Sequence, residues 1–189
     1  MSTITQKPDR NFRSIADTSH VSISDETITP EDPQNYDDIL KFSNAQDCKV
    51  IMCDINPHGG NREDGVDINR FCSDILIRDC KITSGKKYAI TIKGGSESIY
   101  LKNLVLFGRG DEGVDIDIGN YSDSTMKKSK NIILENVHRF DGKPVTLRVG
   151  HASQIFTVNS NVKKLRLQSL GLKIYVYAKA LLVKLKLLG

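Results

Sequence analysis

Carboxylate side chains recur at equivalent points along the middle of the chain, in a pattern that could carry out acid–base chemistry on a sugar. Asp64 precedes a short apolar segment that ends at Ile68, and Asp111 and Glu112 precede a similar segment that ends at Ile116. Hydrolysis of a glycosidic bond needs two carboxyl groups across the scissile bond, one protonated as the acid and one ionised as the base or nucleophile. These three carboxylates are therefore the first candidates for catalytic residues.

The elements that would position these carboxylates form a repeat. Its longer segments have an apolar anchor residue, further apolar residues two and five positions on, and a small polar residue four positions on. The anchors are Val50, Ile75, Ile99, Ile132 and Leu165, and the small polar residues are Asp54, Asp79, Asn103, Asn136 and Ser169. Asn and Asp tolerate a left-handed backbone and can stack as a hydrogen-bonded ladder, so we expect a bend at each of them.

A second, shorter family of apolar segments alternates with the first. Its last apolar members are Phe42, Ile68, Ile92, Ile116 and Leu147. Both families share a period of about 24 residues, with one insertion at residues 119–131. Short alternating strands cannot bury a face alone, but stacked coils of parallel strands enclose one apolar column. A leucine-rich repeat has a comparable period, yet its Leu-x-x-Leu-x-Leu consensus is absent.

The sequence therefore predicts an all-β chain that forms a right-handed parallel β-helix of about five coils with irregular ends. Length allows one domain, and we place the β-helix at residues 36–172. Residues 1–35 are expected to be an N-terminal extended segment or cap. Residues 173–189 are expected to be a C-terminal cap or an oligomer contact, because open strand edges must be covered.

A lysine pair lies between the carboxylates in the repeat. Lys86 and Lys87 occupy the coil between Asp64 and Asp111, so the two carboxylates would be ~10 Å apart along the axis. A cation there favours the ionised form of both carboxylates, which is the wrong direction for a general acid. Alternation of acidic and basic residues on successive coils is also what stability alone would favour. The sequence favours a non-catalytic role, with no assigned catalytic residue.

The segments DGVDI, SDILIRDCKI, AITIKGGSESIYLKN and EGVDIDIG resemble the polygalacturonase family of pectin-lyase-like β-helices, over about residues 37–150. That family carries Asn-Thr-Asp, Gly-Asp-Asp and Gly-His-Gly at successive coils. The corresponding tripeptides here are 62–64 (Arg-Glu-Asp), 86–88 (Lys-Lys-Tyr) and 111–113 (Asp-Glu-Gly). The resemblance thus implies the scaffold, with a degenerate catalytic triplet that keeps only Asp64 and Gly113.

Resemblance to the lyases of the same superfamily implies a second chemistry. Those proteins hold Ca²⁺ with aspartate clusters against an acidic sugar, and an Arg or Lys removes the proton. Asp67, Asp115 and Asp117 would be the calcium ligands, although calcium prefers six to eight oxygens. Lys87 or Arg109 would be the base. If the protein only binds a glycan, the candidate binding residues are Asp67, Lys87, Asp115 and Asp117. For this non-catalytic reading we expect no resident metal or cofactor.

Composition narrows the partners. Aromatic residues make up 6% of the chain, with no Trp, which argues against binding single-stranded nucleic acid by stacking. The sequence contains no apolar run of about 18 residues, which is the length that a membrane-spanning helix needs. The first residues also lack the apolar core of a signal peptide. Residues 1–120 contain 14 Lys or Arg and 20 Asp or Glu, whereas residues 121–189 contain 13 and 3. The charge is therefore polarised along the chain.

Together these features favour a non-catalytic β-helical structural or adhesion component of a phage or virus particle that binds glycans. Its partners would be further copies of itself, other virion proteins or a polysaccharide. The expected location is then the virion, and otherwise the cytoplasm. The alternative is a carbohydrate-active enzyme, either a polygalacturonase-like hydrolase or a calcium-dependent lyase. All of these rest on the habits of the fold rather than on a site.

Overall fold

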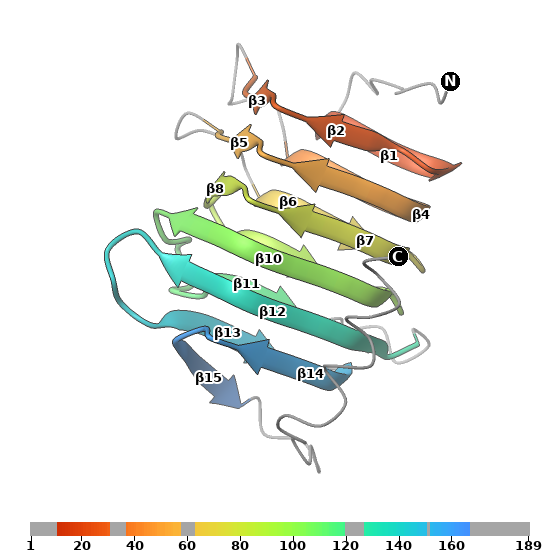
Figure 1. Cartoon of the computed structure of the whole chain (residues 1–189). Coiled ribbons are helices and arrows are strands. Elements are labelled where there is room, and N and C mark those ends of the chain that lie inside the picture. The colour runs from red at the N-terminus through yellow and green to blue at the C-terminus, as the bar shows by residue number, and fades with distance from the viewer. Residues whose placement is uncertain (1–10, 31–36, 58–62, 120–126, 151, 167–189) are drawn as a thin grey trace.

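The computed structural model describes residues 11–30, 37–57, 63–119, 127–150 and 152–166. Every regular element in these residues is a β-strand, and the strands pair in parallel to form a solenoid of about five turns (Figure 1). The predicted all-β, parallel β-helical fold is therefore confirmed. The strands are β1 (Asn11–Ser19), β2 (Ser22–Ser24), β3 (Thr27–Ile28), β4 (Asp38–Ile51), β5 (Asp54–Ile55), β6 (Asp64–Asn69), β7 (Ser73–Arg78), β8 (Lys81–Thr83), β9 (Tyr88–Ile92), β10 (Glu97–Phe107), β11 (Ile116–Ile118), β12 (Ser129–Arg139), β13 (Val145–Val149), β14 (Ala152–Val158) and β15 (Val162–Arg166).

Each turn contributes to three parallel faces, which we call sheets A, B and C. Sheet A contains β6, β9, β11, β13, β15 and the first halves of β1 and β4. Sheet B contains β2, β7, β14, the second half of β4 and the first halves of β10 and β12. Sheet C contains β3, β5, β8 and the ends of β10 and β12.

Apolar side chains from all three sheets fill the interior. In sheet A, Leu40, Val66, Ile90, Ile116 and Leu147 pair in turn across five neighbouring strands and are fully buried. Such columns remove large apolar areas from water on every coil, at about 25 cal/mol per Å², which drives the chain into stacked coils. The four cysteines are free and buried among these residues.

The predicted register of sheet A is confirmed from Phe42 through Ile68 to Ile92 and again from Ile116 to Leu147, but it is wrong by two residues between β9 and β11. Ile118, and not Ile116, pairs with Ile92. A shift of two residues leaves every side chain on the same face of a strand. The alternation of polar and apolar residues therefore cannot distinguish the two registers.

Sheet B corrects the prediction in two places. Val50 pairs with Ile77 rather than Ile75. The strand that continues Ile132 is β14, through Ile155. Leu165 instead lies on β15, opposite Arg148 in sheet A, and is 37% exposed. Because the chain leaves β13 directly into β14, that strand takes the next place in sheet B before the segment with Leu165 is reached.

The predicted polar ladder is present at the bend between sheets B and C. Asn136 Nδ2 donates to Asn103 Oδ1 at 2.9 Å, and Asn103 Nδ2 donates to Asp79 Oδ1 at 2.7 Å. All three have positive φ angles between 52° and 58°. In the preceding coil the left-handed position belongs to Met52, with φ 55°, and not to Asp54, which lies in β5. Ser169 lies outside the described residues.

The first coil lies within the segment assigned to the N-terminal cap. Strands β1, β2 and β3 pair with β4 and β5, and they bury Ile15, Ile23 and Ile28 in the core. The proposed C-terminal cap, residues 173–189, lies outside the described residues. No helix in the described parts of the chain is long and apolar enough to cross a membrane.

Candidate functional site

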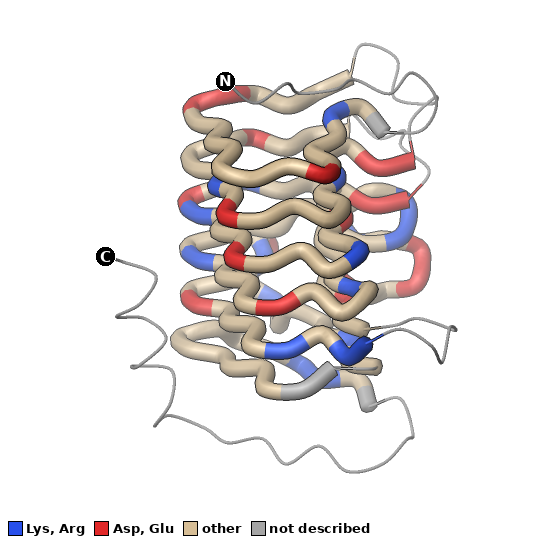
Figure 2. Tube along the Cα trace, turned by 90° about the vertical axis from the view of Figure 1, so that its right-hand side faces the viewer, with Lys and Arg blue, Asp and Glu red and all other residues tan. Residues whose placement is uncertain are grey.

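Charged side chains form a column on the outer face of sheet A. Lys41, Asp67, Thr91, Asp117 and Arg148 pair in turn on β4, β6, β9, β11 and β13. Each lies between two inward apolar residues of its strand, so the pleat directs all five outward. Figure 2 shows acidic and basic segments on successive coils of the solenoid.

Asp67 is held between two lysines. Its carboxylate oxygens lie 3.1 Å from Lys41 Nζ and 3.2 Å from Lys93 Nζ, and the residue is fully buried. Burial by itself lowers the pKa of Lys41, but the charges of Asp67 and Asp38 outweigh it and raise the pKa. The charges of Asp67 and Asp64 likewise outweigh burial and raise the pKa of Lys93, so both lysines are cationic and compensate the buried carboxylate.

Beside this column, the surface contains a polar hollow of about 180 Å³. Its lining residues lie in β6, β9 and β11 or within a few residues of these strands. They are Glu63, Asp64, Lys87, Tyr88, Lys93, Glu112 and Asp117. Lys87 Nζ lies 2.7 Å from Glu63 Oε1, so the acidic and basic residues of neighbouring coils are in contact here, as the charge alternation predicts.

Asp64 is the most perturbed carboxyl group of the hollow. Burial, and then the charge of Asp38, raises its pKa to about 8. Burial also raises the pKa of Glu63, but the hydrogen bond and charge of Lys87 outweigh it and lower the pKa overall. Burial and Asp67 raise the pKa of Asp38 to about 6, against the opposing effect of Lys41. At neutral pH the hollow thus contains a protonated Asp64 beside an ionised Glu63.

Carboxyl oxygens of Asp38, Glu63 and Asp64 lie within 4.8 Å of one another. Two cations already adjoin this cluster, since Lys41 Nζ is 3.1 Å from Asp38 and Lys87 Nζ is 2.7 Å from Glu63. A protonated Asp64 is also a poor metal ligand, because ligation requires the carboxylate. The arrangement has the chemistry of a buried acidic network compensated by lysines.

Arg148 contacts three of the residues that line the hollow, namely Asp117, Glu112 and Tyr88. Its guanidinium binds both carboxylate oxygens of Asp117 at 3.0 Å, and it also contacts Glu112 Oε2 at 2.5 Å. It further donates to the hydroxyl of Tyr88, whose ring centroid is 4.9 Å from the guanidinium carbon. The hydrogen bond from Arg148 lowers the pKa of Glu112. The sequence analysis missed Arg148, although its place after Leu147 matches that of Asp117 after Ile116.

The other predicted site residues lie apart from the hollow. Asp115 is buried, accepts a hydrogen bond from Thr146 N at 2.7 Å and pairs with Arg139. Arg109 donates to Gly113 O at 3.0 Å and to Thr146 Oγ1 at 2.7 Å. Neither residue lines the hollow, and neither does Asp111.

The structure therefore brings together only part of the predicted set. Asp64, Lys87, Glu112 and Asp117 line the hollow, and Asp67 joins it through Lys93. The predicted calcium ligands Asp67, Asp115 and Asp117 each pair with a different cation of the chain. Asp117, and not Asp115, follows Thr91 in the outward column, because of the two-residue difference in register.

Neither a scan against protein-family models nor searches of the curated proteins and of the solved structures found a match to this chain. The resemblance to polygalacturonases thus rests on the strand pattern and on the two matching residues, Asp64 and Gly113.

Proposed function

We propose that the protein is a non-catalytic glycan-binding β-solenoid, serving as a structural or adhesion component of a phage or virus particle. The sugar binds in the hollow on the outer face of sheet A. One observation carries this proposal: the hollow presents fixed ion pairs, Lys87 with Glu63 and Arg148 with Glu112, whose members are partly open to solvent.

The chemistry of these pairs suits a ligand rich in hydroxyl groups. A hydroxyl both donates and accepts hydrogen bonds, so one sugar can donate to Glu63 or Glu112 and accept from Lys87. Hydrogen bonds to charged groups are the stronger kind. Their side chains are already held by their partners, so binding orders few additional rotamers. Because pockets for drug-sized ligands measure about 300–1,000 Å³, a hollow of about 180 Å³ accommodates a single sugar ring.

The burial of the protonated carboxyl group of Asp64 argues against catalysis. Asp64 is 2% exposed, and its Oδ1 atom is buried. A general acid must come within hydrogen-bond reach of the oxygen that it protonates, and a sugar on the rim does not reach this atom. Glu63, the carboxylate beside it, is engaged by Lys87 at 2.7 Å.

Assignment to a particle rests on the habits of the fold. Parallel solenoids are rigid rods whose ends expose strand edges, and such rods serve as spikes, fibres and decorations on virus and phage particles. This support is by analogy of fold. Further copies of the chain or other particle proteins would be the partners at those ends.

One observation favours the enzymatic alternative. The pKa values of Asp64 and Glu63 move in opposite directions, to about 8 for Asp64 and below the ordinary value for Glu63. Such a split is how acid and base are assigned in glycosidases. We therefore retain, as the second proposal, a polygalacturonase-like hydrolase in which Asp64 is the acid and Glu63 the base.

One experiment separates the two proposals. The full chain is applied to an array of immobilised glycans and is also incubated with polygalacturonate, with and without Ca²⁺. We expect retention on at least one class of glycan, loss of that retention in Lys87→Met, and no release of reducing ends or unsaturated product.

Lys143→Met is the matched control, since Lys143 pairs with Asp141 at 3.4 Å and does not line the hollow. Retention unaffected by Lys87→Met would reject the binding proposal. Release of reducing ends that disappears in Asp64→Asn would establish the enzyme instead.

A further inference from the structure

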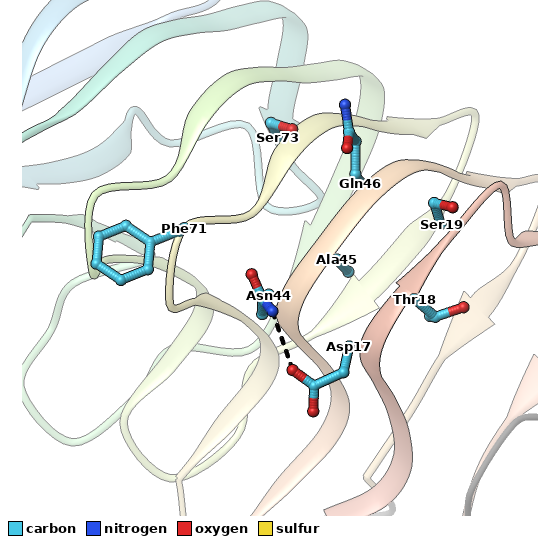
Figure 3. A pocket seen from close by; sticks show the side chains of 8 residues that line it. All are labelled: Asp17, Thr18, Ser19, Asn44, Ala45, Gln46, Phe71 and Ser73. Carbon is cyan, nitrogen blue, oxygen red and sulfur yellow. Dashed lines mark hydrogen bonds between the residues drawn. The ribbon is translucent and has the colours of Figure 1, made fainter.

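A second hollow, of about 330 Å³, lies at the corner where sheet A turns into sheet B. Three successive coils contribute to it, through β1, β4, and the turn before β7 together with the first residue of β7. Its lining residues are Asp17, Thr18, Ser19, Asn44, Ala45, Gln46, Phe71 and Ser73 (Figure 3). None of them belongs to the hollow on sheet A.

Phe71 is the unusual member of this set. Its side chain is 54% exposed, and its backbone has φ 60°, in the left-handed region. A bulky residue in that region is a genuine outlier that costs free energy. At this corner Asp17, Asn44 and Arg70 occupy equivalent left-handed positions on three successive coils, and Phe71 is a second left-handed residue that directly follows Arg70. The fold thus holds an aromatic ring toward water on a strained backbone.

The neighbouring coil leaves room for this ring. A Cβ atom on Gly95 would lie 3.1 Å from two ring carbons of Phe71, so a residue larger than glycine there would displace the ring. Lys127 Nζ lies 5.8 Å from the ring centroid. With both neighbours present, more than half of the side chain remains open to solvent.

Amide and hydroxyl side chains line the same hollow as the ring. Asn44 and Gln46 are exposed, and Asn44 Nδ2 donates to Asp17 Oδ1 at 3.0 Å, which orients the amide. That bond uses one N–H, so the second N–H and the carbonyl can bond a ligand. In Figure 3 the Phe71 ring is seen nearly face-on at one edge of the hollow, with Asn44 and Gln46 across from it.

We propose that this corner hollow is a second saccharide site, which takes a neutral sugar ring on Phe71 and bonds its hydroxyl groups through Asn44 and Gln46. The C–H face of a pyranose is apolar and packs on the negative face of an aromatic ring. Amides recognise hydroxyls because they both donate and accept.

The charge of the lining distinguishes this site from the one on sheet A. The lining contains one carboxylate, Asp17, and no lysine or arginine. Asp17 would repel an acidic sugar. Lys127, whose ammonium group adjoins the Phe71 ring, does not line the hollow, and the groups proposed to bond the ligand, Asn44 and Gln46, are neutral amides, so the proposed ligand is an uncharged saccharide. The inference uses no residue of the sheet A hollow and stands independently of the proposed function.

The test is calorimetric titration of the full chain with neutral oligosaccharides, namely cellohexaose, maltohexaose and mannohexaose, and with trigalacturonate as the acidic probe. We expect at least one neutral probe to bind and trigalacturonate not to bind at this site. Phe71→Ala should weaken the affinity for the neutral probe by about tenfold or more, because the ring on which the sugar packs is lost. Phe71→Trp should retain it.

Phe140→Ala is the matched control, because Phe140 is 72% exposed, stacks on Phe107 and does not line the hollow. It should leave binding unchanged, and Lys87→Met should also leave it unchanged, which separates this site from the one on sheet A. If Phe71→Ala lowers the melting temperature, Gln46→Ala tests the hollow instead, because it leaves the turn that contains Phe71 unchanged. Absence of binding to all three neutral probes, or binding that neither Phe71→Ala nor Gln46→Ala weakens, would overturn the proposal.

Discussion

Glu63 and Asp64 are adjacent in the sequence, yet the fold moves the pKa values of their side chains in opposite directions. Glu63 extends toward Lys87, whose ammonium group is 2.7 Å away, and its pKa falls. Asp64 turns into the coil beside the buried Asp38, and its pKa rises to about 8. The difference arises because one side chain gains a cation and the other loses water.

The raised pKa of Asp64 predicts that the protein loses stability as pH rises. Its folded-state pKa of about 8 lies above the ordinary value of 3.8. The folded state therefore binds more protons than the unfolded state between these values, and the free energy of unfolding falls from about pH 4 to pH 8. Asp64→Asn should remove this dependence and be on the order of 2 kcal/mol more stable than wild type at pH 9.

Urea unfolding at pH 5 and pH 9 measures this difference. Asp141→Asn is the control, because Asp141 is outside the hollow and the hydrogen bond from Arg139 lowers its pKa. It should bring no gain at pH 9. Equal stability of Asp64→Asn and wild type at pH 9 would show that Asp64 is ionised without cost.

Reversing the charge of Lys87 tests whether the ion pairs of the hollow are structural. In Lys87→Glu, repulsion replaces attraction to Glu63, and a like charge is added near Glu112 on the next coil. Exposed pairs contribute ~0.2–1 kcal/mol, so we expect a loss on the order of 1 kcal/mol, smaller at high salt because exposed charges are screened. Thermal melts at low and high salt measure it, with Lys143→Glu as the control at another exposed pair. An unchanged melting temperature with loss of glycan retention would assign Lys87 to binding alone.

Loss of Arg148 should destabilise the last coils. It holds both oxygens of the buried Asp117, so Arg148→Met leaves that carboxylate without its cation. Removing one partner of a buried pair costs about 3–5 kcal/mol, whereas replacing both by apolar residues is often neutral. The double variant Arg148→Met/Asp117→Leu should therefore recover most of the stability in urea unfolding. A double variant no more stable than Arg148→Met would contradict this account.

A charge in the apolar column should abolish folding. Leu101 is fully buried and pairs with Ile77 and Leu134 on the neighbouring strands of sheet B. Leu101→Asp places a carboxylate there with no cation beside it, at a cost that exceeds the stability of most domains. Far-ultraviolet circular dichroism and solubility report the result. Met52→Asp, at a side chain 54% exposed, is the control and should fold.

Local sequence determined the architecture of this protein. Inward apolar residues recur with a period of about 24 residues, and each coil can bury them only against its neighbours, so a parallel solenoid follows. Residues such as Asn103 and Asn136 predict the bends, because their short polar side chains tolerate a left-handed backbone. The contact between Glu63 and Lys87 was also predictable, since it needs only the order of the coils.

Tertiary structure alone decided the register and the membership of the site. A two-residue slip keeps the same side chains inside, so alternation could not place Ile118, rather than Ile116, beside Ile92. That slip brings Asp117 into the outward column and leaves Asp115 with Arg139. The raised pKa of Asp64 likewise depends on Asp38, 26 residues earlier in the chain. Burial and charge act through space, and the distances that set them exist only once the coils have stacked.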